Sequence, residues 1–406
     1  MKLFSKPVFT GVALLPMLAM FTSVHAGQPQ PVGPTEGRCT ATGVAETSRV
    51  LGYCITGGMK KAWFRDANPS ELINLKPLQA NRSCDSSFLS NNVMTGTCDQ
   101  LLGAVLGKVP VFWPAADPKS DPKRLMPLAL DTGADVLAAT LFGNAAGQSI
   151  TLLGNTAVVW PFEKRGEPVQ VSVRNDNCRV AAVADSNING STLVALNCPH
   201  VLGNPTATVA TFNGSSYVMK PLKLPTAAKY CEVTGINSQA QAAGTCHYAI
   251  NTSTATAAAF WSGINAEPKT FVTTDLLATE AAYINDQSSV IVNAITPSKA
   301  KLPIFWPASS AAAPLQIPLP QNFNTCLANA LARSTNTVLM TCGSNDLAVP
   351  VTAYTWSPNG GLNSIQPAPG ADSYRGTAIT ASALEAVGHF KASPQANSQA
   401  FFTPLP

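Results

Sequence analysis

Residues 230–274 read YCEVTGINSQAQAAGTCHYAINTSTATAAAFWSGINAEPKTFVTT, and this stretch shows one structural unit in clear form. Cys231 and Cys246 lie almost symmetrically about positions 238 and 239, so a hairpin centred there brings the two sulfurs face to face. The apolar segment Thr256 to Trp261 is predicted to be a third strand, and Thr270 to Thr274 a fourth. The stretch therefore predicts four antiparallel strands, a to d, with a disulfide between the first two.

Aromatic residues repeat along the chain at steps of about 45 to 52 residues, which is the length of a β-propeller blade. Small residues open the units, as in Ala181 to Ala184, and a strand crowded around a central axis needs small side chains. A helical solenoid does not fit the Thr-, Val- and Pro-rich segments of alternating polarity. The aromatic landmarks are Trp63, Trp113, Trp160, Phe212, Trp261, Trp306, Trp356 and Phe402.

The ten cysteines follow the same period, and they support the repeat independently of the aromatic residues. Each pair flanks a short polar turn inside one unit. Cysteines of an exported chain are oxidised, so disulfides are favoured over metal binding or catalysis. The predicted disulfides are Cys39–Cys54, Cys84–Cys98, Cys178–Cys198, Cys231–Cys246 and Cys326–Cys342.

The predicted fold is all-β, a single β-propeller of eight four-stranded blades, with seven blades as the alternative. The predicted domains are a signal peptide at residues 1–26, an N-terminal segment at residues 27–37 that closes the ring, and the propeller at residues 38–406. The last unit ends at Phe402 to Pro406 without a fourth strand, so part of Pro29 to Thr35 is expected to supply it. The prolines of that segment suit only an edge strand.

Units 3, 6 and 8 lack a cysteine pair but keep the order of strands and turns. In unit 3 we expect strands at Asp135 to Thr140 and Ser149 to Leu153, separated by a turn at Gly143 to Gly147. In unit 6 we expect strands at Ala281 to Ile284 and Ser289 to Ile295. These units should pack like the others, without the covalent link.

The N-terminus has the pattern of a secretory signal peptide, with Lys2 and Lys6 before an apolar run and a small-x-small site ending at Ala26. We expect cleavage near Ala26 and a secreted or periplasmic chain. No later segment approaches the roughly 18 to 20 apolar residues of a membrane span. Without Lys2 and Lys6, the 26 basic residues become 24 against 22 acidic ones. This near balance argues against a nucleic-acid partner.

Short strings in several units resemble the extracellular HAF repeat, whose units carry an A-x-x-I-N turn, a V-x-G strand and an A-F-W strand. The strings are TGIN (234–237), YIND (283–286), KAWF (61–64), AAFW (258–261) and QAFF (399–402). The family pattern lacks the cysteine pair, and several units here replace the turn glycine. The resemblance implies an exported β-propeller and implies no reaction.

Few residues in the sequence indicate catalysis. Beyond the signal segment there are only three histidines, and His200 and His247 follow the second cysteines of units 4 and 5. We expect these two on adjacent b–c loops, either as solvated side chains or as a metal or acid–base pair. No nucleophile elbow, zinc-protease motif or phosphate-binding loop is present. The sequence leaves open a pair of Asp or Glu carboxylates that converge from different blades to cleave a glycosidic bond.

Unit 4 carries a possible calcium loop. The string Asp185-Ser-Asn187-Ile-Asn189-Gly190 matches the start of a D-x-N-x-N-G motif, but position 12 is Leu196, which excludes an EF-hand. The other interpretation is a long hairpin turn rich in Asn and Asp. No other cofactor is expected.

Several lysines lie in or near the predicted b–c connections. In a propeller these connections lie on the face opposite the c–d loops. These lysines suggest a mildly positive face for an anionic partner, although lysines also serve simply to solvate loops. The candidates are Lys60, Lys61, Lys108, Lys299, Lys301 and Lys391.

The function that the sequence favours is non-catalytic recognition or scaffolding, with a glycan or protein bound by loops on one face. The first alternative is a secreted carbohydrate-active enzyme, a hydrolase or lyase with carboxylates at the channel mouth. The second is a structural component of a surface or matrix. An enzyme should show two or three carboxylates converging near the axis, one of them with a raised pKa.

Overall fold

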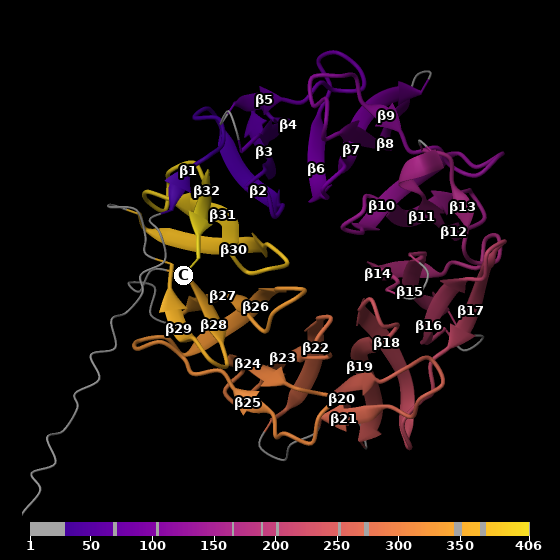
Figure 1. Ribbon diagram of the computed structural model, residues 1–406, viewed down its shortest axis with the longest axis vertical. Coiled ribbons are helices and arrows are strands. Elements are labelled where there is room, and N and C mark those ends of the chain that lie inside the picture. The colour runs from indigo at the N-terminus through magenta and orange to yellow at the C-terminus, as the bar shows by residue number, and fades with distance from the viewer. Residues whose placement is uncertain are drawn as a thin grey trace, which may run out of the picture.

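The chain folds into a β-propeller, a ring of small antiparallel sheets around a central axis (Figure 1). The computed structural model describes residues 29–67, 71–102, 105–164, 166–187, 190–199, 203–250, 253–271, 276–344, 351–365 and 371–405. Within these residues lie six four-stranded sheets and one eight-stranded sheet. The eight-stranded path joins two four-stranded units through a single parallel pairing of Thr206 with Cys231.

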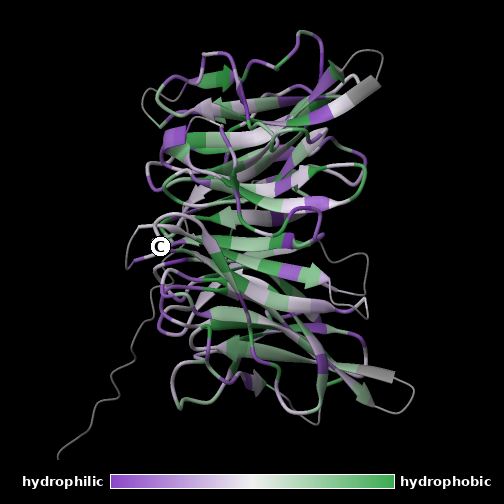
Figure 2. Cartoon of the chain, turned by 90° about the vertical axis from the view of Figure 1, so that its right-hand side faces the viewer, coloured by the Kyte–Doolittle hydropathy of each residue, from purple (hydrophilic) through white to green (hydrophobic). Residues whose placement is uncertain are grey.

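Each unit places strand a nearest the axis and strand d at the rim, and the strands run between the two faces of the disc (Figure 2). The a strands, from unit 1 to unit 8, are β2 (Arg38–Val44), β6 (Cys84–Leu89), β10 (Gly133–Ala139), β14 (Arg179–Asp185), β18 (Ala228–Ile236), β22 (Ala278–Ile284), β26 (Thr325–Leu331) and β30 (Ser373–Ile379). The b strands are β3 (Val50–Thr56), β7 (Val93–Leu102), β11 (Ala145–Ile150), β15 (Thr192–Pro199), β19 (Ala242–Ile250), β23 (Val290–Ile295), β27 (Val338–Gly343) and β31 (Glu385–Lys391).

The outer half of each unit is made by the c strands and the shorter d strands. The c strands are β4 (Met59–Arg65), β8 (Val105–Pro114), β12 (Asn155–Trp160), β16 (Pro205–Phe212), β20 (Ser253–Trp261), β24 (Lys301–Trp306), β28 (Thr352–Ser357) and β32 (Gln399–Pro404). The d strands are β5 (Leu72–Asn74), β9 (Lys123–Arg124), β13 (Val169–Gln170), β17 (Tyr217–Pro221), β21 (Lys269–Phe271), β25 (Leu315–Gln316), β29 (Gly361–Ser364) and β1 (Gln30–Pro31).

One helical turn, η1 (Phe162–Lys164), lies in the c–d connection of unit 3. Among the residues described, no helix has the length and apolar character to cross a bilayer.

The five predicted disulfides are confirmed. Four join register partners of strands a and b in one unit, and the fifth joins Cys178, just before β14, to Cys198 of β15. The sulfurs are buried between neighbouring sheets rather than at the surface. Cys84 and Cys98, for example, pack with Leu51 and Phe64 of the preceding unit. Each disulfide therefore stiffens its own hairpin and also fills the wedge between two units.

Units without a disulfide fill the same register position with other pairs. In unit 8, Tyr374 lies opposite Phe390 and the two rings stack with centroids 5.2 Å apart. In unit 3, Ser149 lies opposite Ala134, and its hydroxyl donates to Asp131. Aromatic stacking and a buried hydrogen bond thus replace the covalent link.

A β-bulge interrupts every a–b pairing, and it explains a recurring glycine in strand b. A Cβ on Gly147 would lie 1.9 Å from the carbonyl oxygen of Asp135, so no other residue fits opposite the bulge without a shift of the backbone. The expectation of a turn at Gly143 to Gly147 is therefore wrong. The a–b turn ends at Asn144, strand b is β11, and Leu152 and Leu153 lie in the b–c turn.

The N-terminal segment supplies the outer strand of unit 8. Gln30 pairs with Phe402 and Pro31 with Phe401, and the Val32 amide donates to Ala400 at 3.1 Å. Val32 is buried beside Trp63 of unit 1. The first and last strands of the chain thus share one sheet (Figure 1).

The Cys231–Cys246 disulfide offers a direct test of local stapling. Replacing both cysteines by serine opens a loop of 15 residues and should lower the free energy of unfolding by about 3 kcal/mol. Urea unfolding of the double variant against the wild type measures the difference. Equal midpoints would contradict a stabilising role.

Candidate functional site

The face that carries the a–b turns holds several hollows, and the first is the mouth of the central channel. Its volume is about 220 Å³, and its walls are the ends of the inner strands with the turns that follow them. Most of the lining is apolar or small, as at Gly43 and Leu331, while Glu46, Asn91 and Arg333 supply polar groups at the rim. This hollow is shallow and offers few fixed polar partners.

The a–b turns are tied to one another by hydrogen bonds that run from unit to unit. These bonds hold the channel mouth in one shape, because each turn is fixed by the next. They are Arg49 Nη1 to Asn91 O (3.4 Å), Asn91 N to Leu141 O (3.3 Å), Phe142 N to Asp185 Oδ2 (3.3 Å), Asn187 N to Ser238 O (3.0 Å), Ser238 N to Asp286 Oδ1 (2.8 Å), Asp286 N to Arg333 O (2.9 Å), Ser334 N to Ala381 O (2.9 Å) and Ser382 N to Glu46 Oε1 (2.8 Å).

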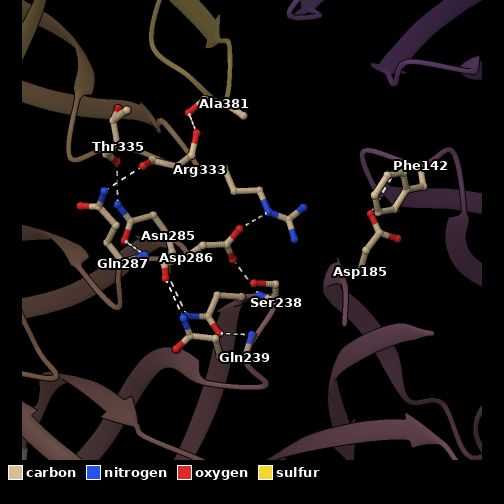
Figure 3. A network of polar contacts seen from close by, with 12 residues as sticks. Phe142, Asp185, Ser238, Gln239, Asn285, Asp286, Gln287, Arg333, Thr335 and Ala381 are labelled. Carbon is tan, nitrogen blue, oxygen red and sulfur yellow. Dashed lines mark hydrogen bonds and ion pairs between the residues drawn. The ribbon is translucent and has the colours of Figure 1, made fainter. Parts of the chain in front are cut away.

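Asp286 is the best-connected residue of this belt (Figure 3). Its carboxylate accepts from the Ser238 amide and from Nε of Arg333 at 2.8 Å, and its backbone oxygen accepts from the Gln239 side chain. Asn285, one residue earlier, donates to Thr335 in the following unit. Arg333, which lines the channel mouth, is therefore occupied by a structural ion pair.

The second hollow is a groove between units 3 and 4, with a volume of about 740 Å³. Phe142 is 61% exposed and Phe162 39% exposed, and both side chains line it. Phe212 and Tyr217 face them from unit 4, with ring centroids 5.3 Å apart. This volume lies in the range typical of small-molecule sites.

Polar groups are held between the aromatic rings of the groove. Asn144 donates to the Thr192 hydroxyl at 2.9 Å and accepts from the Phe162 amide at 2.9 Å, so its amide plane is fixed. Burial raises the pKa of Tyr217 to about 12, although a hydrogen bond with Thr192 acts in the opposite direction. The phenol therefore stays neutral and keeps its proton for hydrogen bonding. Charged groups enter at the edge, with Glu163 and Lys164 on η1.

The sequence did not single out this groove. Phe142 and Phe162 lie in connections, where no repeat marks them. One signal was present: unit 4 has Phe212 at the landmark position that six other units fill with tryptophan. The tryptophans of units 2, 3 and 5 use their indole N–H to anchor the preceding connection, as Trp160 does on Met126 at 2.7 Å. Phenylalanine cannot make that bond, and Phe212 lines the groove instead.

Two carboxylates meet where unit 8 joins unit 1. Glu46 accepts from the amide and hydroxyl of Ser382, and Glu385 accepts from the Ser48 hydroxyl. Burial raises the pKa of Glu385, and repulsion from Glu46 raises it further, against the lowering effect of Ser48. The hydrogen bonds across this junction are reciprocal, since each of the two units contributes one carboxylate and one serine. Its evident role is to clamp the two ends of the ring.

The raised pKa of Glu385 predicts that the stability of the fold depends on pH. A raised pKa means that the folded protein holds this proton more tightly than the unfolded chain, so ionisation of Glu385 lowers stability as the pH rises. Glu385→Gln should therefore melt above the wild type at neutral pH, and the difference should shrink toward about pH 4. Glu46→Gln loses an acceptor for Ser382 and should melt lower. A lower melting temperature for Glu385→Gln at neutral pH would contradict this account.

The predicted lysines are spread over units 1, 2, 6 and 8 and do not form one site. Lys60, Lys61, Lys108 and Lys301 lie in strands, near the b–c ends, rather than in loops. Lys60 is paired with Asp85 of unit 2 at 2.8 Å, and that hydrogen bond raises its pKa. Lys299 is in the b–c turn of unit 6, and Lys391 is the last residue of β31.

His247 lies within β19, so the expectation of a loop position is wrong. Strands β19 and β20 extend to the tip of the hairpin, and the imidazole is mostly buried. It stacks on Tyr230 with centroids 4.3 Å apart, and Nε2 lies 3.4 Å from Glu232. His200 lies outside the described residues, so its predicted proximity to His247 stays a prediction.

The candidate calcium ligands are only partly described. Asp185 ends β14, is 5% exposed, and directs one carboxylate oxygen at the Phe142 amide of unit 3 (Figure 3). The Asn187 side chain is exposed, and Asn189 lies outside the described residues. The residues that the structure describes contain no group of three or more His, Cys, Asp or Glu suited to a metal ion. Calcium at this loop stays a prediction.

Comparison with known proteins supports the fold. No protein-family model matches this sequence, and no curated protein matches it. Dipeptidyl peptidase 4 of Porphyromonas gingivalis is similar in structure, with a TM-score of 0.57 at 8% identity over 89% of this chain and 57% of that one. Prolyl oligopeptidase B of Galerina marginata is also similar in structure, with a TM-score of 0.54 at 11% identity over 91% of this chain and 55% of that one.

A third similar structure is the β-propeller domain of the Trilobed protease from Pyrococcus furiosus, with a TM-score of 0.47 at 7% identity over 85% of this chain and 96% of that one. This chain spans little more than half the length of the two larger proteins. At such low identity the likeness shows the fold alone. The chain therefore belongs to the structural class of β-propellers, with disulfides inside five of its units.

Proposed function

We propose that this chain is an exported recognition propeller that binds a glycan in the groove between units 3 and 4. The observation that carries the proposal is the pair of exposed rings, Phe142 and Phe162, beside the fixed amide of Asn144. The C–H face of a sugar ring packs against an aromatic face, while its hydroxyl groups pair with amides and hydroxyls. Few charges line the groove, which suits a largely neutral ligand.

The rest of the chain is consistent with this role. Five disulfides and a near-neutral composition suit a protein outside the cytoplasm, and the expected signal peptide would take it there. The resemblance to the HAF repeat agrees, because that family is defined by its repeat and not by a reaction. A scaffold or matrix role for the same fold would instead show as self-association on size-exclusion chromatography.

A screen of immobilised glycans with the oxidised protein, beginning at residue 27, tests the proposal. We expect binding to a restricted set of neutral oligosaccharides, lost when Phe142 is replaced by alanine. Binding to peptides but to no glycan would overturn the choice of ligand. A Phe142→Ala variant that binds like the wild type would overturn the choice of groove.

The enzyme alternative has one favourable observation, the raised pKa of Glu385 beside Glu46. A carboxyl group with a raised pKa beside a second carboxylate is the usual equipment for glycoside hydrolysis. However, Ser382 and Ser48 already occupy these carboxylates across the seam between units 8 and 1. New reducing ends in a mixture of protein and oligosaccharide, absent for Glu46→Gln, would favour hydrolysis.

A further inference from the structure

The face opposite the groove carries a cluster of exposed aliphatic side chains, which we call the leucine patch. Its members are Leu130 (94% exposed), Leu152 (96%), Leu153 (83%) and Val173 (71%). Single exposed leucines are ordinary, but a cluster on adjoining loops marks a contact surface. The patch lies on b–c and d–a connections, whereas the glycan groove lies among a–b and c–d connections.

Three loops of units 2, 3 and 4 bring the patch together. The Thr132 amide donates to Ile150 at 2.9 Å, which ties the loop of Leu130 to strand b of unit 3. Thr151 donates to the Asn175 side chain at 2.9 Å, which ties the turn of Leu152 to the loop of Val173. Arg174 closes the set by donating to Ala129 at 2.7 Å. The aliphatic side chains therefore project from one fixed base.

Leu130 is held in an unusual conformation. Its φ is +74°, in the left-handed region that favours glycine and asparagine. Among the described residues with positive φ, it is the only large aliphatic one. The conformation is unfavourable for leucine and gains no burial, because the side chain is almost wholly in solvent. Such strain at an exposed tip indicates a use outside the free monomer.

Exposed cationic side chains lie on the same face as the patch. The Asp131 side chain is fully buried, where it accepts from Arg174 and from Ser149. Arg174 remains 42% exposed despite that ion pair. Lys108 and Arg179 are exposed on the same face, near the b–c ends of units 2 and 4. The patch thus lies on a face with three exposed cationic side chains, two of which, Lys108 and Arg179, also act on the half-buried carboxylate of Asp135.

We propose that the leucine patch docks this protein on an anionic lipid surface. The four side chains are 71 to 96% exposed and protrude from their loops, so a rigid partner would need a matching cavity for each one. A bilayer interface yields to protruding leucines, and its anionic head groups complement Arg174, Lys108 and Arg179. Docking through this face leaves the groove between units 3 and 4 directed away from the membrane.

Vesicle sedimentation tests this with the full mature chain. Wild-type protein should partition onto vesicles of phosphatidylglycerol mixed with phosphatidylcholine, and less onto phosphatidylcholine alone. For the double variant Leu152→Ser with Leu153→Ser, the partition coefficient onto the anionic vesicles should fall at least about tenfold. Leu384→Ser is the matched control, since Leu384 is also exposed but lies in the a–b turn of unit 8. Both variants should keep the wild-type melting temperature, since the substituted side chains lie in solvent.

Three results would overturn the proposal. Wild-type protein that stays in the supernatant with both vesicle types excludes lipid docking. Equal partitioning of the double variant and the wild type excludes this patch. Concentration-dependent dimerisation of the wild type without vesicles, abolished in the double variant, assigns the patch to a second copy of the chain.

Discussion

Removal of Pro29 to Gly37 should lower the melting temperature by roughly 10 °C. The segment supplies the outer strand of unit 8 and buries Val32 beside Trp63 and Ala400. Losing the ladder bonds, the burial of Val32 and the cover over the Trp63 ring amounts to about 5 kcal/mol. The loss falls at the one seam where the chain ends meet, so the remaining contacts between units 8 and 1 weaken with it. Differential scanning calorimetry gives the shift.

Two further variants distinguish the loss of contacts between units 8 and 1 from a general effect of shortening the chain. Val32→Asp places a charge in the buried contact with Trp63 and should destabilise almost as much as the deletion. Alanine at both Thr35 and Glu36, which are exposed, should leave the melting temperature within a degree or so. An unchanged melting temperature for the deletion would mean that the ring does not depend on this strand.

Alanine at both Phe142 and Phe162 should weaken glycan binding about a hundredfold. Each exposed ring offers a stacking face worth about 1.4 kcal/mol, near a factor of ten in affinity. Neither side chain is in the buried core, so the variant should fold normally and separate binding from stability. Isothermal titration with the best glycan from the screen measures the change.

Leu384→Ala is the matched control for this experiment. Leu384 is exposed on the same face, in the turn before β31, but lies outside the groove. It should bind like the wild type. If the control loses affinity as strongly as the phenylalanine variant, the assignment of the ligand to the groove is wrong.

The repeat made the fold predictable from sequence. Cys231 and Cys246 marked one hairpin, and cysteine pairs 14 to 20 residues apart in units 1, 2, 4 and 7 marked the corresponding hairpins there. Local disulfides constrain strands that are adjacent in sequence, so spacing alone identifies the partners. Strand order then followed from short connections, since consecutive strands in an antiparallel unit are neighbours.

Unit 3 shows where the pattern misled. The run Ser149 to Leu153 looked like a strand because it is apolar, and Gly147 looked like a turn. In fact, Gly147 lies opposite Val136 at the start of the bulge, where a Cβ would strike the carbonyl oxygen of Asp135, and Leu152 and Leu153 turn into solvent. Hydrophobicity alone cannot distinguish a buried strand from an exposed turn that carries leucines, because both are rich in apolar residues.

The candidate site was less predictable than the fold. Phe142 and Phe162 come from different connections of unit 3, and Tyr217 comes from strand d of unit 4. No spacing rule joins them, since their proximity depends on how two sheets pack at the rim. The belt between Asp286 and Arg333 was hidden for the same reason, because the two residues are 47 positions apart in adjacent turns.

Saturation-transfer NMR on an oligosaccharide mixed with the oxidised protein tests the central claim, recognition without catalysis, most directly. The account predicts transfer to the sugar protons for the wild type, none for the variant with alanine at Phe142 and Phe162, and an oligosaccharide that is recovered intact. Equal transfer in both proteins, or oligosaccharide cleaved by the wild type and not by Glu46→Gln, would contradict it.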